Sequence, residues 1–281
     1  MVAPDEPYGT LAGVYEWLVP EELSAPQGSV AAFADVFDGL DSGARVLDCA
    51  AGTGQLAVGL ALRGFEVVAS DASSAMIERT RALAARHGVE LTTVTCAWEE
   101  LERQGFGRAF DAVFCVGNSL THAAGRAGRR AALAAMSGVV REDGLVVVTS
   151  RNWERVRDQG PRLAVSDTLI EREGARGLVI HVWSIPDAWD EPHLLDVAVA
   201  IIDQADGVTT RAERLVFWPF GHETLDRDLR AARLVPVSST YAPEADRYRV
   251  VARRAGPRTA HLAVQARAAP VERTDVYERR R

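Results

Sequence analysis

The chain has 281 residues, 47% of them apolar, which is enough for one large α/β domain with an addition to it. Its formal net charge of −7 argues against a nucleic-acid surface, which needs a basic stripe. No apolar run reaches the length of a membrane span, the first residues lack the apolar core of a signal peptide, and an odd number of cysteines suits a reducing compartment. We therefore expect a cytoplasmic protein without a nucleic-acid or membrane partner.

Two helical patterns open the chain. Apolar residues recur at helical spacing over residues 9–19 and again over 29–40, where Ser29 is the expected N-cap. We predict that residues 1–40 form an N-terminal helical lid. Three residues of the first pattern are candidates for contact with a substrate: Tyr15, Glu16 and Trp17. The alternative is that the two rings pack this helix onto the domain and that the carboxylate is solvated.

Residues 41–159 alternate apolar strands with helices, and residues 221–254 continue the pattern. This order is typical of a Rossmann-like, doubly wound and mostly parallel α/β sheet. The strands are expected at residues 45–49, 66–70, 91–95, 112–116, 144–150, 235–241 and 248–253, and the helices at 55–63, 74–88, 128–140 and 222–232. Ser74 is the expected N-cap of its helix, and Gly88 is expected to end it. Ligands bind such sheets at the carboxyl ends of the strands, so we expect the site there.

The stretch Val46–Gln55, VLDCAAGTGQ, predicts a buried strand, a glycine turn and the start of a helix. Glycine lets a ligand approach the backbone closely, and Asp71 ends the next strand, where a doubly wound sheet binds a ribose diol. A dinucleotide site needs G-x-G-x-x-G, but the turn here reads D-x-A-x-G-T-G, without a third glycine in register. The carboxylate of Asp48 would repel a pyrophosphate, whereas it suits a ligand that carries an ammonium and a sulfonium.

This turn, together with Asp71, resembles motif I of the class I S-adenosylmethionine (SAM) dependent methyltransferases. From about residue 40 to 255 the chain is similar to the glycine/sarcosine N-methyltransferase group, in the segments Val46–Gly54, Ala69–Met76, Phe110–His122, Gly144–Trp153 and Val216–Leu229. The first 40 residues do not match. The resemblance implies that SAM is the cofactor, that S-adenosylhomocysteine is a product, and that a small molecule accepts the methyl group.

The resemblance also implies roles for single residues. The cofactor residues would be Asp48, Ala50, Gly52, Gly54, Asp71, Ala72, Met76, Ala97, Trp98, Val116 and Ser119. Asp71 would bind the ribose, and Trp98 would stack on the adenine unless it only caps the following helix. Asn118 and Arg151 match residues that hold the substrate in the family, and the alternative for Arg151 is an ion pair with Glu154.

Residues 160–220 break the α/β rhythm and predict an antiparallel sheet inserted over the site, here called the roof. Its strands are expected at residues 168–171, 178–185, 193–202 and 208–218, with a hairpin turn at Asp206-Gly207. Trp183 and Trp218 belong to a concentration of aromatic residues in the roof. We expect them to line a pocket for a flat, apolar substrate, and the alternative is that they form the core of the roof. From residue 255 onward the composition predicts a disordered tail.

The expected reaction is transfer of the SAM methyl group to a small nucleophile. The resemblance favours glycine or sarcosine. The tryptophan-rich roof and the unmatched first 40 residues favour instead an indole-type or other aromatic nitrogen compound of secondary metabolism, methylated at nitrogen or at a nucleophilic carbon such as indole C3. Methylation at C3 needs a base for the ring N–H, for which Tyr15, Glu16 and His122 are the candidates, although a histidine here can also be purely structural.

No metal site is expected, because the six histidines are scattered along the chain. The sequence leaves a homo-oligomer open. Two other function classes also stay open: a nucleotide-dependent oxidoreductase, and a SAM-binding regulator that does no chemistry.

Overall fold

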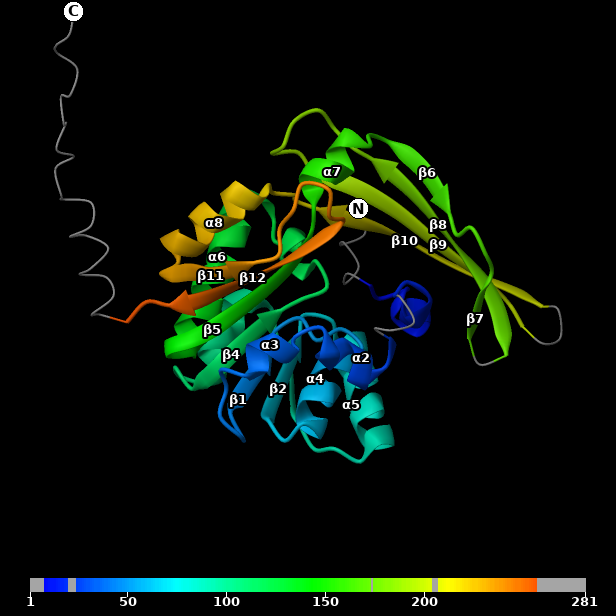
Figure 1. The fold of residues 1–281 in the computed structure, drawn as a ribbon. Coiled ribbons are helices and arrows are strands. Elements are labelled where there is room, and N and C mark those ends of the chain that lie inside the picture. Colours follow the sequence, from blue (N-terminus) through cyan, green and yellow to red (C-terminus); the bar gives the residue numbers. More distant parts are fainter. Residues whose placement is uncertain (1–7, 20–23, 173, 204–206, 257–281) are drawn as a thin grey trace, which may run out of the picture.

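The computed structural model describes residues 8–19, 24–172, 174–203 and 207–256, in which two sheets are formed (Figure 1). In this part of the chain, one sheet has seven strands in the order β11-β12-β5-β4-β1-β2-β3. The other has five strands, β10-β9-β8-β6 with β7 beside β8. The first sheet is Rossmann-like and the second is the roof, so the predicted architecture is confirmed. Most of the predicted tail, residues 255–281, lies outside the described residues.

The seven-stranded sheet consists of β1 (Arg45–Asp48), β2 (Glu66–Asp71), β3 (Thr92–Thr95), β4 (Phe110–Cys115), β5 (Val140–Arg151), β11 (Leu234–Ser239) and β12 (Arg247–Arg254). The first five are parallel, and β12 is antiparallel to both of its neighbours, β5 and β11. Side chains alternate between two cores. Val46 of β1 packs in the core with α4 (Gln55–Leu62), whereas its neighbour Leu47 packs in the core with α6 (Gly125–Val139). Because both faces are buried, these strands read as nearly continuous apolar runs in the sequence.

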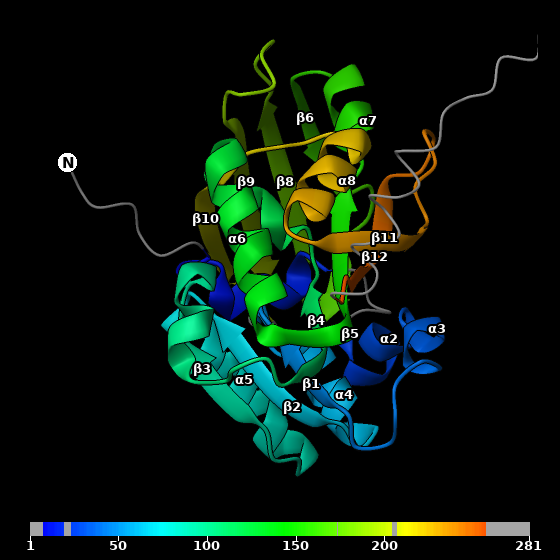
Figure 2. The same ribbon diagram turned by 90° about the vertical axis from the view of Figure 1, so that its left-hand side faces the viewer.

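Helices cover both faces of this sheet. One face carries α2 (Pro26–Ala31), α3 (Ala34–Phe37) and α4, and α5 (Ser74–His87) packs beside α4. The opposite face carries η2 (Trp98–Gln104), α6 and α8 (His222–Ala231). Figure 2 shows α6 and α8 side by side on that face. None of the described helices is long and apolar enough to cross a lipid bilayer.

The N-terminal elements are shorter than the sequence predicts. The pattern over residues 9–19 forms the 3₁₀ helix η1 (Ala12–Trp17), which packs between the roof and α5 and is the unlabelled dark blue helix below β9 and β10 in Figure 1. The single helix predicted over 29–40 is in fact α2 and α3, and Ser29 lies inside α2 instead of capping it. α2 begins at Pro26, because the fixed φ of proline suits the first helical position and its missing N–H is not needed there. The role of this region as a lid stays a prediction.

At the N-terminal end of α5 the predicted cap is wrong, and at the C-terminal end the predicted end at Gly88 is confirmed. The N-cap is Ser73 and not Ser74, because the hydroxyl of Ser73 accepts a hydrogen bond from Met76 N at 3.3 Å. Gly88 ends the helix with a φ of 63°, a left-handed conformation that glycine adopts without strain.

The roof consists of β6 (Arg162–Val165), β7 (Ile170–Arg172), β8 (Ala175–Ser184), β9 (His193–Ile202) and β10 (Val208–Phe217). The four predicted strands correspond to β7 through β10, whereas β6 and the helix α7 (Trp153–Asp158) were not predicted. The inner face of the roof packs on η1 and α7. Gly177 of β8 meets the ring of Trp17 so closely that an added Cβ would lie 2.7 Å from it. In the predicted β9–β10 turn, Gly207 O accepts from Asp203 N, and Asp206 lies outside the described residues.

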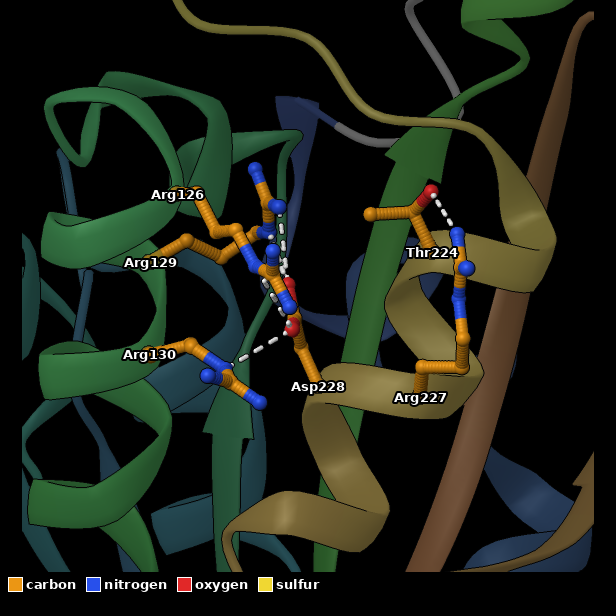
Figure 3. Close-up of polar contacts among 6 residues, drawn as sticks. All are labelled: Arg126, Arg129, Arg130, Thr224, Arg227 and Asp228. Carbon is orange, nitrogen blue, oxygen red and sulfur yellow. Dashed lines mark hydrogen bonds and ion pairs between the residues drawn. The ribbon is translucent and has the colours of Figure 1, made fainter.

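A buried ion cluster joins α6 to α8 (Figure 3). The carboxylate of Asp228 accepts hydrogen bonds from Nε and Nη2 of Arg129, at 2.9 and 2.7 Å, and from Nε of Arg130 at 3.0 Å. Arg126 Nε lies 3.9 Å from the same carboxylate. Burial of the Asp228 charge is tolerated because both of its oxygens have cationic donors. The cluster therefore fixes α8 on the face of the sheet.

Candidate active site

A cavity of about 880 Å³ opens at the carboxyl ends of β1, β2 and β4, next to the N-terminal segment. Every predicted cofactor residue lines it except Gly54. Of the candidate bases, Tyr15 and His122 line it and Glu16 does not. The five predicted substrate residues are not among its lining residues: Trp17, Asn118, Arg151, Trp183 and Trp218.

The glycine turn has two different glycine roles. Gly52 has a φ of +55°, and a Cβ added there would meet no atom within 4 Å, so its backbone faces open space in the cavity. Gly54 has a φ of +92°, and an added Cβ would lie 2.9 Å from Cα of Thr80. The hydroxyl of Thr80 in turn donates to Gly52 O at 2.9 Å. Gly54 thus permits the close approach of α5 that shapes the turn, and it does not itself line the cavity.

Asp71 ends β2 with its carboxylate held by the backbone. Oδ2 accepts from Gly52 N at 2.8 Å, and Oδ1 accepts from Ser73 N at 2.9 Å. These bonds connect the acid to the glycine turn and fix its orientation at the cavity wall. Since each carboxylate oxygen can accept more than one hydrogen bond, the arrangement fits the two hydroxyls of a ribose.

Asp48 is fully buried at the end of β1, and neither of its oxygens has a hydrogen-bond partner of normal geometry among the described residues. Burial raises the pKa of Asp48 to about 7, and the Ala50 and Ala57 amides only partly oppose this. A buried carboxylate without a partner at the edge of a cavity calls for a cationic ligand group. The turn, Asp71 and Asp48 therefore fit a nucleoside that carries positive charge, as SAM does.

Two other predicted cofactor contacts have fixed positions. Nε1 of Trp98 donates to Cys49 O at 2.8 Å, which holds the indole against the cavity at the first residue of η2. Trp98 therefore both begins a helix and offers a ring to the cavity. The hydroxyl of Ser119 donates to Val116 O at 2.7 Å and closes the turn after β4.

A chain of hydrogen bonds links the N-terminal segment to the roof through His122. Nδ1 of His122 lies 3.0 Å from Val216 O, and Nε2 lies 3.0 Å from the hydroxyl of Tyr8. A carbonyl only accepts, so Nδ1 carries the proton in the neutral imidazole, and Nε2 accepts from Tyr8. The rings of Tyr8, Tyr15 and His122 are arranged edge to face, with centroids 5.6 and 5.4 Å from that of Tyr8.

The surroundings keep this group of rings uncharged. Burial lowers the pKa of His122 to about 4 and raises the pKa values of Tyr8 and Tyr15. At neutral pH the imidazole is therefore an uncharged acceptor and the phenols are protonated. Tyr8 was not predicted as a site residue, because its contact with His122 joins residues 114 positions apart and no local pattern reports it.

Asn118 is buried and bonded within the fold. Its Oδ1 accepts from Arg151 N at 3.0 Å and from Trp153 Nε1 at 3.1 Å. The predicted alternative for Arg151, a pair with Glu154, is not formed: Oε1 of Glu154 accepts from His222 N at the start of α8, and its Oε2 has no hydrogen-bond partner among the described residues. The guanidinium of Arg151 lies 5.5 Å from the ring centroid of Trp183.

Arg151 forms no ion pair within the described part of the chain. Burial, together with the like charge of Arg247, lowers its pKa to about 10, and the charge of Asp246 only partly opposes this. Arg247 itself lines the cavity. A small anion such as a carboxylate would relieve the repulsion between these two arginines.

The tryptophans predicted for the substrate lie elsewhere. Trp17 and Trp183 are buried in the core between η1, α7 and the roof. Trp218 lines a separate hollow beside the start of α6. The aromatic side chains of the cavity come mainly from other segments, among them Tyr8, Tyr15 and Phe33. The substrate roles of all three tryptophans stay predictions. Among the described residues, no three His, Cys, Asp or Glu side chains gather in a way that could hold a metal ion.

Comparisons with known proteins agree with this geometry. Residues 46–144 match a family model described as a methyltransferase domain. The chain has the fold of the methyltransferase CcbJ of Streptomyces caelestis, with a TM-score of 0.71 over 90% of this chain and 100% of that one, at 22% identity. The match over residues 46–144 and the shared fold support a class I SAM-dependent methyltransferase.

Two further proteins illustrate the range of this class. A glycine/sarcosine N-methyltransferase of Halorhodospira halochloris is 36% identical over 116 residues, which cover 41% of this chain. The match spans 43% of that relative's length. The SAM-bound structure of CalS10, an amino pentose methyltransferase of Micromonospora echinaspora, has a TM-score of 0.69 at 21% identity and covers 90% of this chain and 99% of that one.

Proposed function

We propose that this methyltransferase transfers the methyl group of SAM to nitrogen or a nucleophilic carbon of a small aromatic nitrogen compound, with indole-type compounds as the preferred substrates. The observation that carries the proposal is the Tyr8–His122 hydrogen bond at 3.0 Å, at the wall of the same cavity that Asp48 and Asp71 line. An uncharged histidine paired with a phenol is a base suited to an acceptor that must lose a proton.

The proposed cofactor contacts follow from charge and geometry. When bound, SAM supplies an electrophilic methyl group on a sulfonium, and transfer of that group moves one positive charge to the acceptor. Asp71, fixed by Gly52 N and Ser73 N, would accept from the ribose hydroxyls. Asp48 would become fully ionised beside the positive charge, since an opposite charge nearby favours the ionised form of a carboxyl. The indole of Trp98, held by Cys49 O, would pack on the adenine.

The proposed proton path balances the charge that the acceptor receives. The acceptor N–H gives its proton to the oxygen of Tyr8, and Tyr8 gives its own proton to Nε2 of His122. His122 then carries the positive charge, with Nδ1–H still donating to Val216 O. Tyr8 ends unchanged, and the net charge of the cavity is the same before and after transfer. His122 is deprotonated at the start at neutral pH because its pKa is about 4.

The aromatic wall supports a flat acceptor. Tyr8 and Tyr15 pack edge to face at 5.6 Å and line the cavity together with Phe33. Such rings form a large contact area with a planar, apolar group, but only a small one with a molecule the size of glycine. This support comes from the N-terminal segment and α2–α3, not from the tryptophans of the roof.

Glycine or sarcosine is the second candidate substrate. It is supported by the 36% identical relative named a glycine/sarcosine N-methyltransferase, and by Arg151 and Arg247, whose pKa values are lowered by desolvation and whose positive charges would suit a carboxylate. An amine that is already deprotonated needs no base for the transfer itself. The two candidates therefore differ in whether Tyr8 and His122 matter for the rate.

Labelled SAM and a panel of acceptors test the proposal. The panel contains glycine, sarcosine, tryptophan, tryptamine derivatives and cyclic dipeptides that contain tryptophan. Asp71→Ala, which we expect to lose affinity for the cofactor, is the negative control. We expect label on an indole compound with the wild type and none with Asp71→Ala. Label on glycine or sarcosine alone would contradict the preferred substrate in favour of the second candidate. No label on any acceptor would contradict the proposed activity.

A further inference from the structure

The carboxylate of Glu213 in the roof accepts hydrogen bonds from three backbone amides of the N-terminal segment. Oε1 of Glu213 accepts from Tyr8 N at 2.6 Å, and Oε2 accepts from Thr10 N and Leu11 N, both at 3.1 Å. Glu213 lies on β10, where it pairs with Val197 of β9. Charge-assisted hydrogen bonds of this kind are stronger than neutral ones, and here they bind main chain and not side chains. The contact joins parts of the chain 205 positions apart.

Tyr8 has a backbone conformation that its surroundings must impose. Its φ is +66°, in the left-handed region that residues with a Cβ rarely occupy. Such strained residues persist only where several contacts hold them, and they are frequent at functional sites. Besides the bond from its amide to Glu213, Tyr8 O accepts from Ala12 N at 2.8 Å. These two bonds hold the amide and the carbonyl on either side of the strained Cα.

The same strand also holds the other member of the Tyr8–His122 pair. Val216 of β10 accepts the Nδ1 proton of His122 at 3.0 Å. Directly after β10, Trp218 N donates to Thr121 O at 2.6 Å, next to His122 in the chain. β10 therefore fixes the imidazole through Val216 O and the tyrosine backbone through Glu213, three residues away on one rigid strand.

We propose that Glu213 is a positioning residue, which sets the hydroxyl of Tyr8 against Nε2 of His122. It touches neither reacting atoms nor the cavity wall, and it acts only through the backbone of Tyr8. The expected effect of Glu213 on the rate of methyl transfer rests on the proposed function, whereas its effect on the position of Tyr8 does not. A purely structural tether would instead stabilise the segment without any coupling to the hydroxyl of Tyr8.

Hydrogen exchange tests the placement without need of a substrate. In Glu213→Gln only one side-chain oxygen can still accept, so the amides of Tyr8, Thr10 and Leu11 should exchange about 10-fold faster or more. Glu213→Asp keeps the charge on a shorter side chain and should lie between the wild type and Glu213→Gln. Asp196→Asn removes another roof carboxylate, which pairs with Arg214, and should leave these amides unchanged. Unchanged exchange in Glu213→Gln would overturn the proposal.

A double-mutant cycle then tests the coupling to the hydroxyl. Glu213→Gln should lower kcat by about 10-fold or more when residue 8 is tyrosine, and by less than about 2-fold in the Tyr8→Phe background. Equal losses in both backgrounds would overturn the positioning role and leave a structural tether. The proposed function fails separately, and visibly, if wild type transfers no label or if Tyr8→Phe is as active as wild type. In that case faster exchange in Glu213→Gln would still place Tyr8 under the control of Glu213.

Discussion

Single titratable residues determine the charge of the cavity before any ligand enters. Burial raises the pKa of Asp48 to about 7 and lowers the pKa of His122 to about 4, so both groups are pushed towards their neutral forms. Such a site suits a ligand that is itself charged. Groups with such displaced pKa values are concentrated in active sites, where stability is given up for function.

Asp48→Asn should stabilise the ligand-free protein and weaken SAM binding. The pKa of Asp48 is about 7 in the folded protein against about 3.9 in the unfolded chain, so its ionisation destabilises the fold increasingly as the pH rises from about 4 to 7. In Asp48→Asn the free energy of unfolding should rise on the order of 3 kcal/mol near pH 8, with little gain near pH 4.

Denaturant unfolding at both pH values and calorimetry with SAM check this. For the wild type, SAM affinity should fall as the pH drops through about 7, because Asp48 then takes up a proton. Asp226→Asn, which removes a surface partner of Arg230, is the matched control and should change neither stability by more than about 1 kcal/mol nor SAM affinity. A variant that is less stable near pH 8, or that binds SAM as wild type does, would contradict this account of Asp48.

At the scale of elements, sequence patterns predict single helices and strands, but they do not predict which of these elements contact one another. The sequence predicts α6 and α8 from their periodicity, but not that Asp228 of one meets Arg129 and Arg130 of the other. Likewise the sequence does not predict β6, because its four residues are largely exposed and show no clear alternation of apolar and polar side chains. It is a strand because it pairs with β8, with Arg162 beside Trp183. The long buried strands of the main sheet were predicted correctly because apolar runs report burial on both faces directly.

Asp228→Asn should be among the most destabilising conservative changes in the chain. It leaves the buried guanidinium of Arg129 without its negative partner, which costs about 3–5 kcal/mol when one member of a buried pair is removed. The midpoint of denaturant unfolding measures the loss. Arg227→Ala on the same helix removes only an exposed bond to Thr224 (Figure 3) and should cost less than about 1 kcal/mol. Similar losses in the two variants would show that the ion cluster contributes no special stability.

At the scale of the whole molecule, the site is assembled from distant parts of the chain. The cavity wall that contains the glycine turn, Asp48 and Asp71 is predictable, because its residues follow consecutive strands and their motif is local. The opposite wall is not predictable, because its contacts join residues far apart in the sequence. Tyr8 bonds to His122, 114 positions away, and to Glu213, 205 positions away. The family resemblance begins near residue 40, so it gave no guide to Tyr8. Aromatic side chains of the roof such as Trp183 pack instead in the core between the roof, η1 and α7.

The central claim is that Tyr8 and His122 take the acceptor's proton during methyl transfer. The most direct measurement is the single-turnover rate of label transfer from SAM to the best acceptor of the panel, in wild type and in Tyr8→Phe. Phenylalanine keeps the ring but cannot relay a proton, so we predict a rate about 100-fold to 10,000-fold lower, with unchanged SAM affinity. Tyr241→Phe, a tyrosine stacked on His222 outside the cavity, should transfer at the wild-type rate. Transfer by Tyr8→Phe at the wild-type rate would contradict the account.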